Sequence, residues 1–553
     1  MTKRFPKLFI TLAVVLFLLN LIQSGLTELI YDEAYYWYYA KTLDWGYFDH
    51  PPLVAFMIYL GTQLFDNELG VRLVCCIFSV GTYFFLWLCI DNPKKSKYIL
   101  HFFLLVFSMT LMNAYGFLTL PDTPLLFFTA VFLWLYKQYL VKPSWSIAIG
   151  LGLTMAAVMY SKYHGVLVIL FVVFSNLKLL KDAKAWTAVG IALLCYTPHF
   201  YWLFENDFVS IRYHLYERPN QPYSFTKFTL GYLVNLVAIF GLVFYWMYLA
   251  LFKTKTTDAF SRALKVMSYG VLIFFFISSF NRRVQTQWII IVTIPMVLIA
   301  YNYLLENATA RKWVFRVSSV GFFILLYARL WMIYQPLLPL QFETHGNQEW
   351  VADLALKSEG VPVVFENSYR RAPMYEFYNR TSSFTLNNYM YRKNQYSVDD
   401  SENEVRGNRI LYVTKYANSG DISYYSTDST LYYGRFIEDF QSYRNLQCMV
   451  TPTAKKDVFE MQVYNPYDFD VPLEKLKFTV AFSNRHKQVK DLKKIEDIRL
   501  EQRDLQSIAS KDTIGYTFIL PQSKMEEPSY FRVGISEDNL PPGLNSIPVK
   551  INP

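Results

Sequence analysis

"LFITLAVVLFLLNLIQSGLTELIYDEAYYWYYAKTLDWGYFDHPPLVAF", residues 8–56, decides the fold class, because a long apolar run leads straight into a stretch rich in acids and aromatic side chains. The run over residues 8–26 is long enough to cross the hydrocarbon core of a membrane, which takes about 20 residues. Its basic start is typical of a signal peptide, but the apolar core is longer and no small-residue cleavage site follows. We therefore expect a retained transmembrane helix.

The composition predicts a membrane part and a soluble part. Of the 553 residues 53% are hydrophobic and 18% aromatic, and the mean hydropathy is +0.17. Apolar runs crowd residues 8–334, whereas the chain after "WMIYQPLLPLQFETHG" is polar. We expect an α-helical membrane domain over residues 1–334 and a soluble region over residues 335–553.

Further apolar runs predict roughly eleven transmembrane helices in the membrane domain. The short run 51–66 is expected to be a re-entrant or interfacial helix. The expected spans are 8–26, 71–90, 98–118, 121–140, 145–160, 165–178, 185–203, 228–252, 266–280, 285–304 and 313–333.

The loop charges predict the orientation. With the N-terminus in the cytoplasm, all six cytoplasmic segments, such as "DNPKKSK" and "KLLKDAK", are rich in Lys or Arg. The opposite loops carry most of the acids, and an odd number of spans places the soluble region outside the cytoplasm. The net charge of +9 therefore reports topology, and we do not expect a nucleic-acid partner.

Motifs exclude several kinds of chemistry. The sequence contains neither a P-loop nor a dinucleotide fingerprint. Cys448 is the one cysteine in the soluble region, so that region cannot form an internal disulfide, and no CxxC spacing is present. A reaction on the outer face needs a substrate that is already activated, and a lipid phosphate is the natural carrier inside a membrane.

The first candidate site is the acidic, aromatic stretch. A helix over "DEAYYWYYA" places Asp32, Tyr36 and Tyr39 on one face. The aromatic side chains also fit an interfacial helix in an aromatic belt. That alternative explains the adjacent acids Asp32 and Glu33 less well, and a carboxylate there can act as general base for a hydroxyl.

Two further acids stand next to prolines. Pro51–Pro52 predicts a helix start that fixes Asp49 and His50 near a helix N-terminus, where anions bind. In "LTLPDTPLLFF", Asp122 lies at a span end, where an ionisable group is a functional-site hypothesis. For both Asp49 and Asp122, the alternative is a helix N-cap.

Basic residues also gather at outer span ends. Such cations either clamp a lipid phosphate or extend to the membrane surface from a helix end. They are Lys162 in "SKYHG", Arg218 in the loop after residue 203, and Arg282 and Arg283 in "NRRVQTQW".

Together these stretches resemble the lipid-phosphate-dependent glycosyltransferases of the GT-C fold. The resemblance is to the bacterial branch of the protein O-mannosyltransferase superfamily, glycosyltransferase family 39, which includes the aminoarabinose transferase of lipid A. It rests on "YDEAYYWYYAKTLDWGYFDHPPLVAF", "LPDTPLLFF", "SKYHG" and "NRRVQTQW", and covers roughly residues 8–334.

The resemblance implies roles for these residues. Asp32 would be the catalytic base, Glu33 would complete the acidic pair, and Asp122 would be the second carboxylate. Asp49 and His50 would line the same cavity, although some relatives carry Glu-Lys there. The implied substrate-binding residues are Tyr36, Asp49, His50, Lys162, Arg218, Arg282 and Arg283.

The implied reaction is an inverting transfer of a sugar from a polyprenyl-phosphate donor to a hydroxyl. The acceptor would be protein, lipid A or another envelope glycan outside the cytoplasm of a bacterial inner membrane. No metal-ligating residues are expected, and whether the reaction requires a divalent metal ion as cofactor is left open. The alternatives are a transporter or flippase, disfavoured because no internal repeat is visible, and an inactive scaffold, disfavoured by the concentration of acids.

The soluble region predicts two modules. Residues 335–425 show a helix, strand, helix, strand order typical of a small α/β module, with "VPVVFE" and "RILYVT" as buried strands. Residues 426–553 alternate as in a β-sandwich, for example in "KFTVAFSN" and "YFRVGIS". The basic, aromatic loop "NYMYRKNQY" is either a cover for the active site or a plain surface loop.

Overall fold

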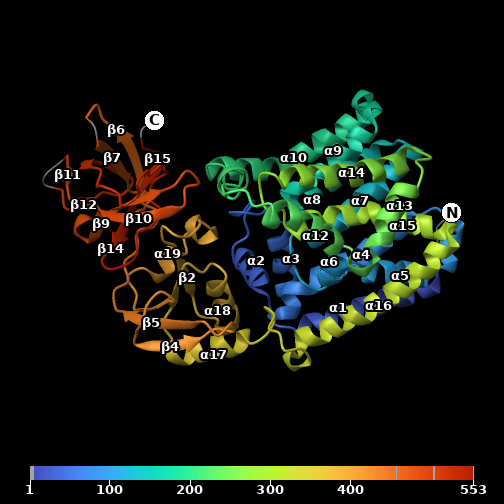
Figure 1. The fold of residues 1–553 in the computed structure, drawn as a ribbon, viewed down its shortest axis with the longest axis horizontal. Helices are drawn as coiled ribbons and strands as arrows, with labels where there is room; N and C mark the ends of the chain where they lie inside the picture. Colours follow the sequence, from blue (N-terminus) through green and yellow to red (C-terminus); the bar gives the residue numbers. More distant parts are fainter. Residues whose placement is uncertain (1–4, 456, 502–504, 552–553) are drawn as a thin grey trace. The chain divides into compact units, whose positions relative to one another are not determined.

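The computed structural model describes residues 5–455, 457–501 and 505–551, so Lys3 and Arg4 of the expected cytoplasmic start lie outside the described residues. The chain divides into two compact units (Figure 1). The first comprises residues 1–219 and 223–347, and the second comprises residues 220–222 and 348–553. The module boundaries at residues 334 and 425 remain predictions.

The first unit is helical, as expected. Among the described residues, six helices are long and apolar enough to cross a membrane. They are α1 (Lys7–Leu26), α4 (Glu68–Cys89), α7 (Asp122–Val141), α10 (Ala183–Glu205), α14 (Ala259–Ser278) and α16 (Ala308–Ile333). Shorter helices are α3 (Leu53–Thr62), α8 (Trp145–Ser161), α9 (Val166–Ser175), α11 (Val209–Arg212) and α15 (Thr293–Glu306). The described residues thus contain six helices of membrane-spanning length, or up to seven if the bent pair described below counts as one span, where the sequence predicted roughly eleven. The other expected spans hold shorter helices, so the number of complete spans was overestimated.

Two expected spans are broken. Residues 98–118 form α5 (Ile99–Phe107) and α6 (Thr110–Ala114), because Met109 adopts an extended conformation. Residues 228–252 form α12 (Gly231–Ala238) and α13 (Phe244–Lys253), with a bend of 95° between the apolar pair. Gly241 at this bend has a φ of +56°, which a residue with a Cβ adopts only at a cost.

A buried arginine forms hydrogen bonds at the break between α5 and α6. Asn113 donates from its amide to the carbonyl of Phe107, and its own side-chain oxygen accepts from Nε of Arg329 on α16. Arg329 also donates to Oδ1 of Asn20 on α1 and to the carbonyl of Asn113. The backbone carbonyls of Phe107 and Asn113 are therefore paired inside the protein, as a membrane interior requires.

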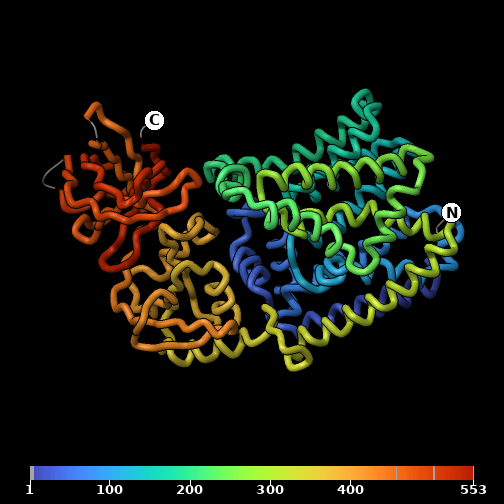
Figure 2. The backbone as a smooth tube through the Cα atoms, in the orientation of Figure 1, coloured from blue at the N-terminus to red at the C-terminus, as the bar shows by residue number. Residues whose placement is uncertain are grey.

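The aromatic stretch forms α2 (Tyr31–Lys41), which packs against α3 (Figure 2). Its tyrosines and Trp37 are at most 9% exposed. The alternative of an aromatic belt whose side chains face lipid is therefore not supported, whereas the position of α2 at the membrane surface stays a prediction. The side chains are buried in the protein, because both faces of α2 are covered by neighbouring segments.

The second unit begins with a five-stranded sheet of order β2-β1-β3-β5-β4. β1 (Val363–Glu366) pairs in parallel with β2 (Ser383–Leu386) and β3 (Ile410–Thr414), so "VPVVFE" and "RILYVT" contain neighbouring strands. β4 (Ile422–Tyr425) and β5 (Leu431–Ile437) continue the sheet in antiparallel fashion. The helices of this part are α17 (Asn347–Lys357), α18 (Arg371–Asn379) and α19 (Glu402–Val405).

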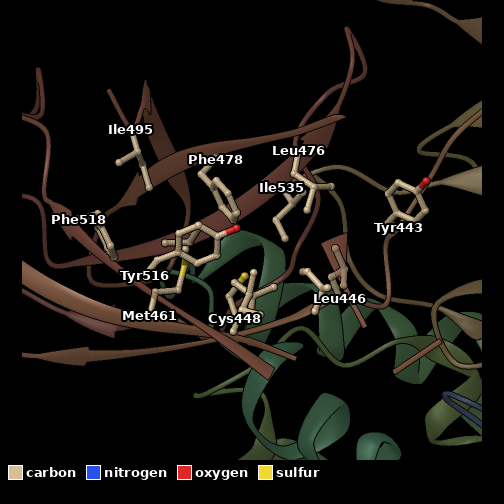
Figure 3. Close-up of a cluster of buried hydrophobic side chains, with 14 of the residues drawn as sticks. Tyr443, Leu446, Cys448, Met461, Leu476, Phe478, Ile495, Tyr516, Phe518 and Ile535 are labelled. Atoms are coloured by element: carbon tan, nitrogen blue, oxygen red, sulfur yellow. The ribbon is translucent and has the colours of Figure 1, made fainter. Parts of the chain in front are cut away.

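The remaining strands form two four-stranded sheets around one hydrophobic core (Figure 3). One sheet has the order β10-β9-β14-β15 and the other β11-β13-β7-β6, with a small pair β12-β8. Cys448 lies in this core with Met461, Phe478 and Tyr516, which explains its burial as a free thiol. The strands are β6 (Gln447–Pro452), β7 (Val458–Tyr464), β8 (Val471–Pro472), β9 (Leu476–Ser483), β10 (Val489–Lys494), β11 (Ile498–Leu500), β12 (Ser507–Ile508), β13 (Thr513–Ile519), β14 (Tyr530–Glu537) and β15 (Val549–Lys550).

Candidate active site

Glu33 fixes the start of α2. Its carboxylate accepts from the backbone N–H of Ile30 at 3.2 Å, which caps the helix, and from the N–H of Thr119 at 2.8 Å. It also receives two hydrogen bonds from Arg72 on α4, Nε at 2.8 Å and Nη2 at 2.6 Å. Both side chains are fully buried. These four donors engage both oxygens of Glu33, a geometry that favours a positioning role.

Arg72 extends this link to the end of α1. Its Nη1 donates to the carbonyls of Ser24 and Thr27, and its Nη2 to the carbonyl of Glu28. One guanidinium therefore joins the last turn of α1 to the first turn of α2. Sequence reasoning missed Arg72, although an arginine inside an apolar run is itself a signal for a functional or structural role.

Asp32 and Asp122 lie near the same tyrosine. Asp32, in the first turn of α2, is half-buried, and Asp122, in the first turn of α7, is 2% exposed. Tyr115 precedes α7 in the chain, is 8% exposed and interacts electrostatically with both carboxylates. The two acids that the sequence singled out thus face one region of the membrane unit. No motif pointed to Tyr115.

Lys162 pairs with Asp122 in a buried ion pair. Its Nζ lies 2.7 Å from Oδ1 and 2.9 Å from Oδ2 of the carboxylate. The alternative of an N-cap role for Asp122 is not supported, because Pro121 is the N-cap of α7 and the described structure shows no side-chain cap hydrogen bond there. The pair joins the start of α7 to the residue that follows α8. Lys162 and Asp122 are therefore brought together, and each neutralises the other.

Asp49 and His50 sit in a loop ordered by tyrosines. Tyr39 donates to Oδ1 of Asp49 at 2.8 Å, and its ring stacks on Tyr47 at 4.3 Å. The N-cap of α3 is Pro52, and Asp49 does not serve as that cap. His50 contacts the ring of Tyr36, with centroids 5.4 Å apart. Tyr36 is thus placed beside His50, and the substrate-binding role that the sequence predicts for both stays a prediction.

Several basic side chains surround His50. Burial lowers the pKa of His50 to about 3, the charges of Lys162, His214 and Arg218 lower it further, and Asp49 opposes them. The imidazole is consequently neutral, and its buried Nδ1 has no hydrogen-bond partner among the described residues. A neutral imidazole in this position can donate to or accept from a ligand.

His214 links two parts of this basic cluster, and we include Arg218 and Arg282 in it. One ring nitrogen of His214 contacts the carbonyl of Asp49 at 2.8 Å, and Arg282 donates to the carbonyl of His214 at 3.1 Å. Partial burial and the charge of Arg218 lower the pKa of Arg282. Cations held this close together favour an anionic ligand.

Arg218 and Arg283 differ in their surroundings. Arg218 donates to the side chain of Gln285 at 2.6 Å, and its guanidinium lies 4.8 Å from the ring centroid of Trp288. Arg283 is exposed. The described structure therefore brings Arg218 to the basic cluster but gives no contact that would place Arg283 there.

The described part of the chain forms no candidate metal centre. Among the residues described, no group of three or more His, Cys, Asp or Glu side chains is arranged to hold a metal ion. The histidines near the site contact aromatic rings and backbone carbonyls, as His164 does with the ring of Trp288. His164 and His214 both lie close enough to His50 for their charges to influence each other, although the three residues are far apart in the sequence.

Comparison with known structures identifies the fold. ArnT from Cupriavidus metallidurans superposes with a TM-score of 0.52 and 14% identity, over 73% of this chain and 92% of that one. The membrane unit has the GT-C glycosyltransferase fold. A second structure of the same ArnT, with undecaprenyl phosphate bound, matches equally well, with a TM-score of 0.52 and 15% identity.

Sequence comparison agrees with this GT-C fold. Residues 49–202 match the family model described as dolichyl-phosphate-mannose-protein mannosyltransferase. The lipid A galacturonosyltransferase RgtD of Rhizobium johnstonii is 25% identical over 219 residues, which are 37% of this chain and 45% of that protein. The chain thus matches less than half the length of this curated relative. The resemblance to aminoarabinose-transferase-like proteins expected from the sequence is confirmed.

Proposed function

We propose that this GT-C protein is an inverting glycosyltransferase. It moves a sugar from a polyprenyl-phosphate donor to a hydroxyl of an acceptor outside the cytoplasm. The observation that carries the proposal is the buried ion pair of Asp122 and Lys162, which lies in the same electrostatic environment as the half-buried Asp32, Tyr115 and His50. The family match, the relative that acts on lipid A and the ArnT structure with a bound lipid phosphate support it.

In the proposed reaction Asp32 acts as general base. The acceptor hydroxyl oxygen attacks the anomeric carbon while Asp32 takes its proton. The new carbon–oxygen bond forms as the bond from the anomeric carbon to the phosphate oxygen breaks, which inverts the configuration. The polyprenyl phosphate leaves as an anion with the electron pair of the broken bond, so the site has to stabilise negative charge on the leaving group.

The basic cluster would supply that stabilisation. Arg218 and Arg282 are already held by Gln285 and by the carbonyl of His214, so their guanidinium groups are oriented before a ligand arrives. Lys162 would have to share its charge between Asp122 and the phosphate. Arg283, being exposed, would contact the donor only at the mouth of the site.

The carboxylates other than Asp32 would orient the site. Glu33 holds α2 through Arg72, and Asp122 holds Lys162. Asp49, bonded to Tyr39, would position His50 and Tyr36 beside the sugar. That Glu33 and Asp122 take part in the chemical step itself stays a prediction, and the variants described in the Discussion test it.

Exchange of Asp32 for Asn tests the assignment of the base. The assay is release of undecaprenyl phosphate from a panel of undecaprenyl-phosphate sugars, together with mass spectrometry of cell-envelope glycans. Asp32→Asn should reduce transfer by about 10²–10⁴-fold, the usual contribution of a general base, with an unchanged melting temperature. Asp66→Asn, the same chemical change at an exposed position, is the matched control. Near-normal transfer by Asp32→Asn would refute the role of Asp32.

The proposed location is a bacterial inner membrane, with the N-terminus in the cytoplasm and the second unit on the opposite side. The basic loops support this orientation. A reporter enzyme that is active only outside the cytoplasm, fused after residue 553, should be active, and the same reporter fused after Lys255 should be inactive. The opposite pattern would contradict the orientation. The acceptor then belongs to the cell envelope, as a protein, lipid A or another glycan.

A further inference from the structure

The five-stranded sheet of the second unit has a topological switch point. The chain runs from β1 through α18 to β2 on one side, and then crosses to β3 on the other side of β1. The carboxyl ends of these parallel strands meet at one edge, since Glu366 pairs with Leu386 and Phe365 pairs with Val413. In open α/β sheets, ligands bind outside the carboxyl ends of the strands at such a point, here between β1 and β3.

Hydrogen bonds join the residues at this switch point. Glu366, the last residue of β1, accepts from Nδ2 of Asn388 at 2.6 Å and from the hydroxyl of Thr414, the last residue of β3. The next residue, Asn367, has a φ of +55° and accepts from the N–H of Asn388 at 2.9 Å. Its Nδ2 is buried and has no hydrogen-bond partner among the described residues. Left-handed backbone and an unsatisfied amide at one edge are typical of a binding site.

Tyrosines and cations from three loops lie around this edge. The rings of Tyr369 and Tyr391 are 6.1 Å apart, and the guanidinium of Arg392 lies 4.4 Å from the ring centroid of Tyr369. Tyr391 also neighbours Arg370 and Tyr416 electrostatically. Tyr416 is 55% exposed, and Lys415 beside it is exposed as well. The basic, aromatic loop "NYMYRKNQY" thus belongs to the same edge as the strand ends.

The side chains define the chemistry of a ligand. Flat tyrosine rings give apolar platforms with polar tips, which match the faces and hydroxyls of a sugar ring. Arg370, Arg392 and Lys415 come from the segments that follow β1, β2 and β3, and such cations bind carboxylate or phosphate groups. The loop after β1, "NSYRRA", contains no glycine, unlike the glycine-rich turns that let a pyrophosphate approach the backbone.

We propose that this edge, formed by the residues that follow β1, β2 and β3, binds an acidic saccharide. Tyr369, Tyr391 and Tyr416 contact the sugar rings, and Arg370, Arg392 and Lys415 bind its carboxylate or phosphate groups. The site is separate from the glycosyl transfer proposed above, because its residues all belong to the second unit and binding is measured without a donor. A failure of one proposal leaves the other standing.

Calorimetric titration of the full-length protein in nanodiscs of neutral phosphatidylcholine tests the site. The probes are tetragalacturonate, its methyl ester, which keeps the rings but removes the charges, and a tetra-aspartate peptide, which keeps the charges but has no ring. Tetragalacturonate should bind at least tenfold more tightly than either of the others. Arg392→Gln, Lys415→Gln and Tyr416→Ala should each weaken its binding about tenfold.

The variants are chosen so that unfolding cannot imitate a loss of binding. Lys415 and Tyr416 are exposed, so their exchange removes little packing. Arg485→Gln, at an exposed position on the β-sandwich, is the matched control and should bind as the wild type does. The proposal is overturned if tetragalacturonate does not bind, if the ester or the peptide binds equally well, or if all three variants bind normally.

Discussion

Exchange of Glu33 for Gln separates a positioning role from a catalytic one. The change leaves the guanidinium of Arg72, with a side chain that is 0% exposed, without a counter-ion, and it replaces one acceptor oxygen by an N–H₂ donor that faces other donors. Breaking a buried ion pair in this way costs about 3–5 kcal/mol. For a unit of about 340 residues, an unfolding entropy of about 2.1 cal/mol/K per residue converts that loss into a melting-temperature drop of about 4–7 °C.

A thiol-reactive fluorescent dye gives the assay, because Cys75 and Cys76 are buried and become reactive when the membrane unit unfolds. Arg72→Gln should destabilise to a similar extent, and the double variant Glu33→Gln/Arg72→Gln should lose less than the sum of the two. Transfer by Glu33→Gln should fall only because α2 and Asp32 are displaced. A variant with wild-type melting temperature but no transfer would refute this reasoning and favour a catalytic Glu33.

Three further variants follow from the described contacts. Asp122→Asn leaves Lys162 as a buried, unpaired cation, so the melting temperature should fall by several degrees. The double variant Asp122→Asn/Lys162→Met should recover part of that loss. Equal melting temperatures of the single and the double variant would argue against the Asp122–Lys162 ion pair. His50→Gln should flatten the pH dependence of stability. With a folded pKa near 3 and an unfolded value near 6.5, the unfolded chain binds more protons between these pH values, so the wild type loses at most about 2 kcal/mol of stability between pH 7 and pH 5. Denaturation at several pH values measures this loss, and an unchanged slope in His50→Gln would contradict a neutral His50. Gly241→Ala should cost about 1–2 kcal/mol, seen in the same dye assay and absent from Gly190→Ala as control, since φ is +56° and the added Cβ would lie 3.0 Å from Oγ1 of Thr110.

Much of the membrane unit could be predicted because apolar length is a strong signal. Each expected span contains helix, and the acidic residues Asp32, Glu33 and Asp122 all lie in first turns of helices. The breaks at Met109 and Gly241 could not be predicted, because broken and straight spans have the same apolar composition. The pairing partners that repair a break come from distant helices, as Arg329 does for Asn113.

The candidate site shows the same limit. Residue types indicated which acids and bases were candidates, but their roles depend on partners far away in the sequence. Glu33 is separated from Arg72 by 39 residues and Asp122 from Lys162 by 40, and neither pair has a spacing that a motif would show. The sequence could not exclude the alternative that the aromatic residues of α2 face lipid, because burial of both faces of a helix by its neighbours leaves no mark in its own sequence.

The buried arginine of α16 bears on how this protein is made. Arg329 stands four residues before the end of α16, and its charged side chain is only 3% exposed, so it is enclosed by protein. Its hydrogen-bond partners, Asn20 and Asn113, belong to segments that the ribosome delivers much earlier. The helix α16 therefore gains its full stability only after the bundle that contains α1 and α6 has assembled. Completion of the membrane unit during biogenesis depends on the correct placement of those two helices.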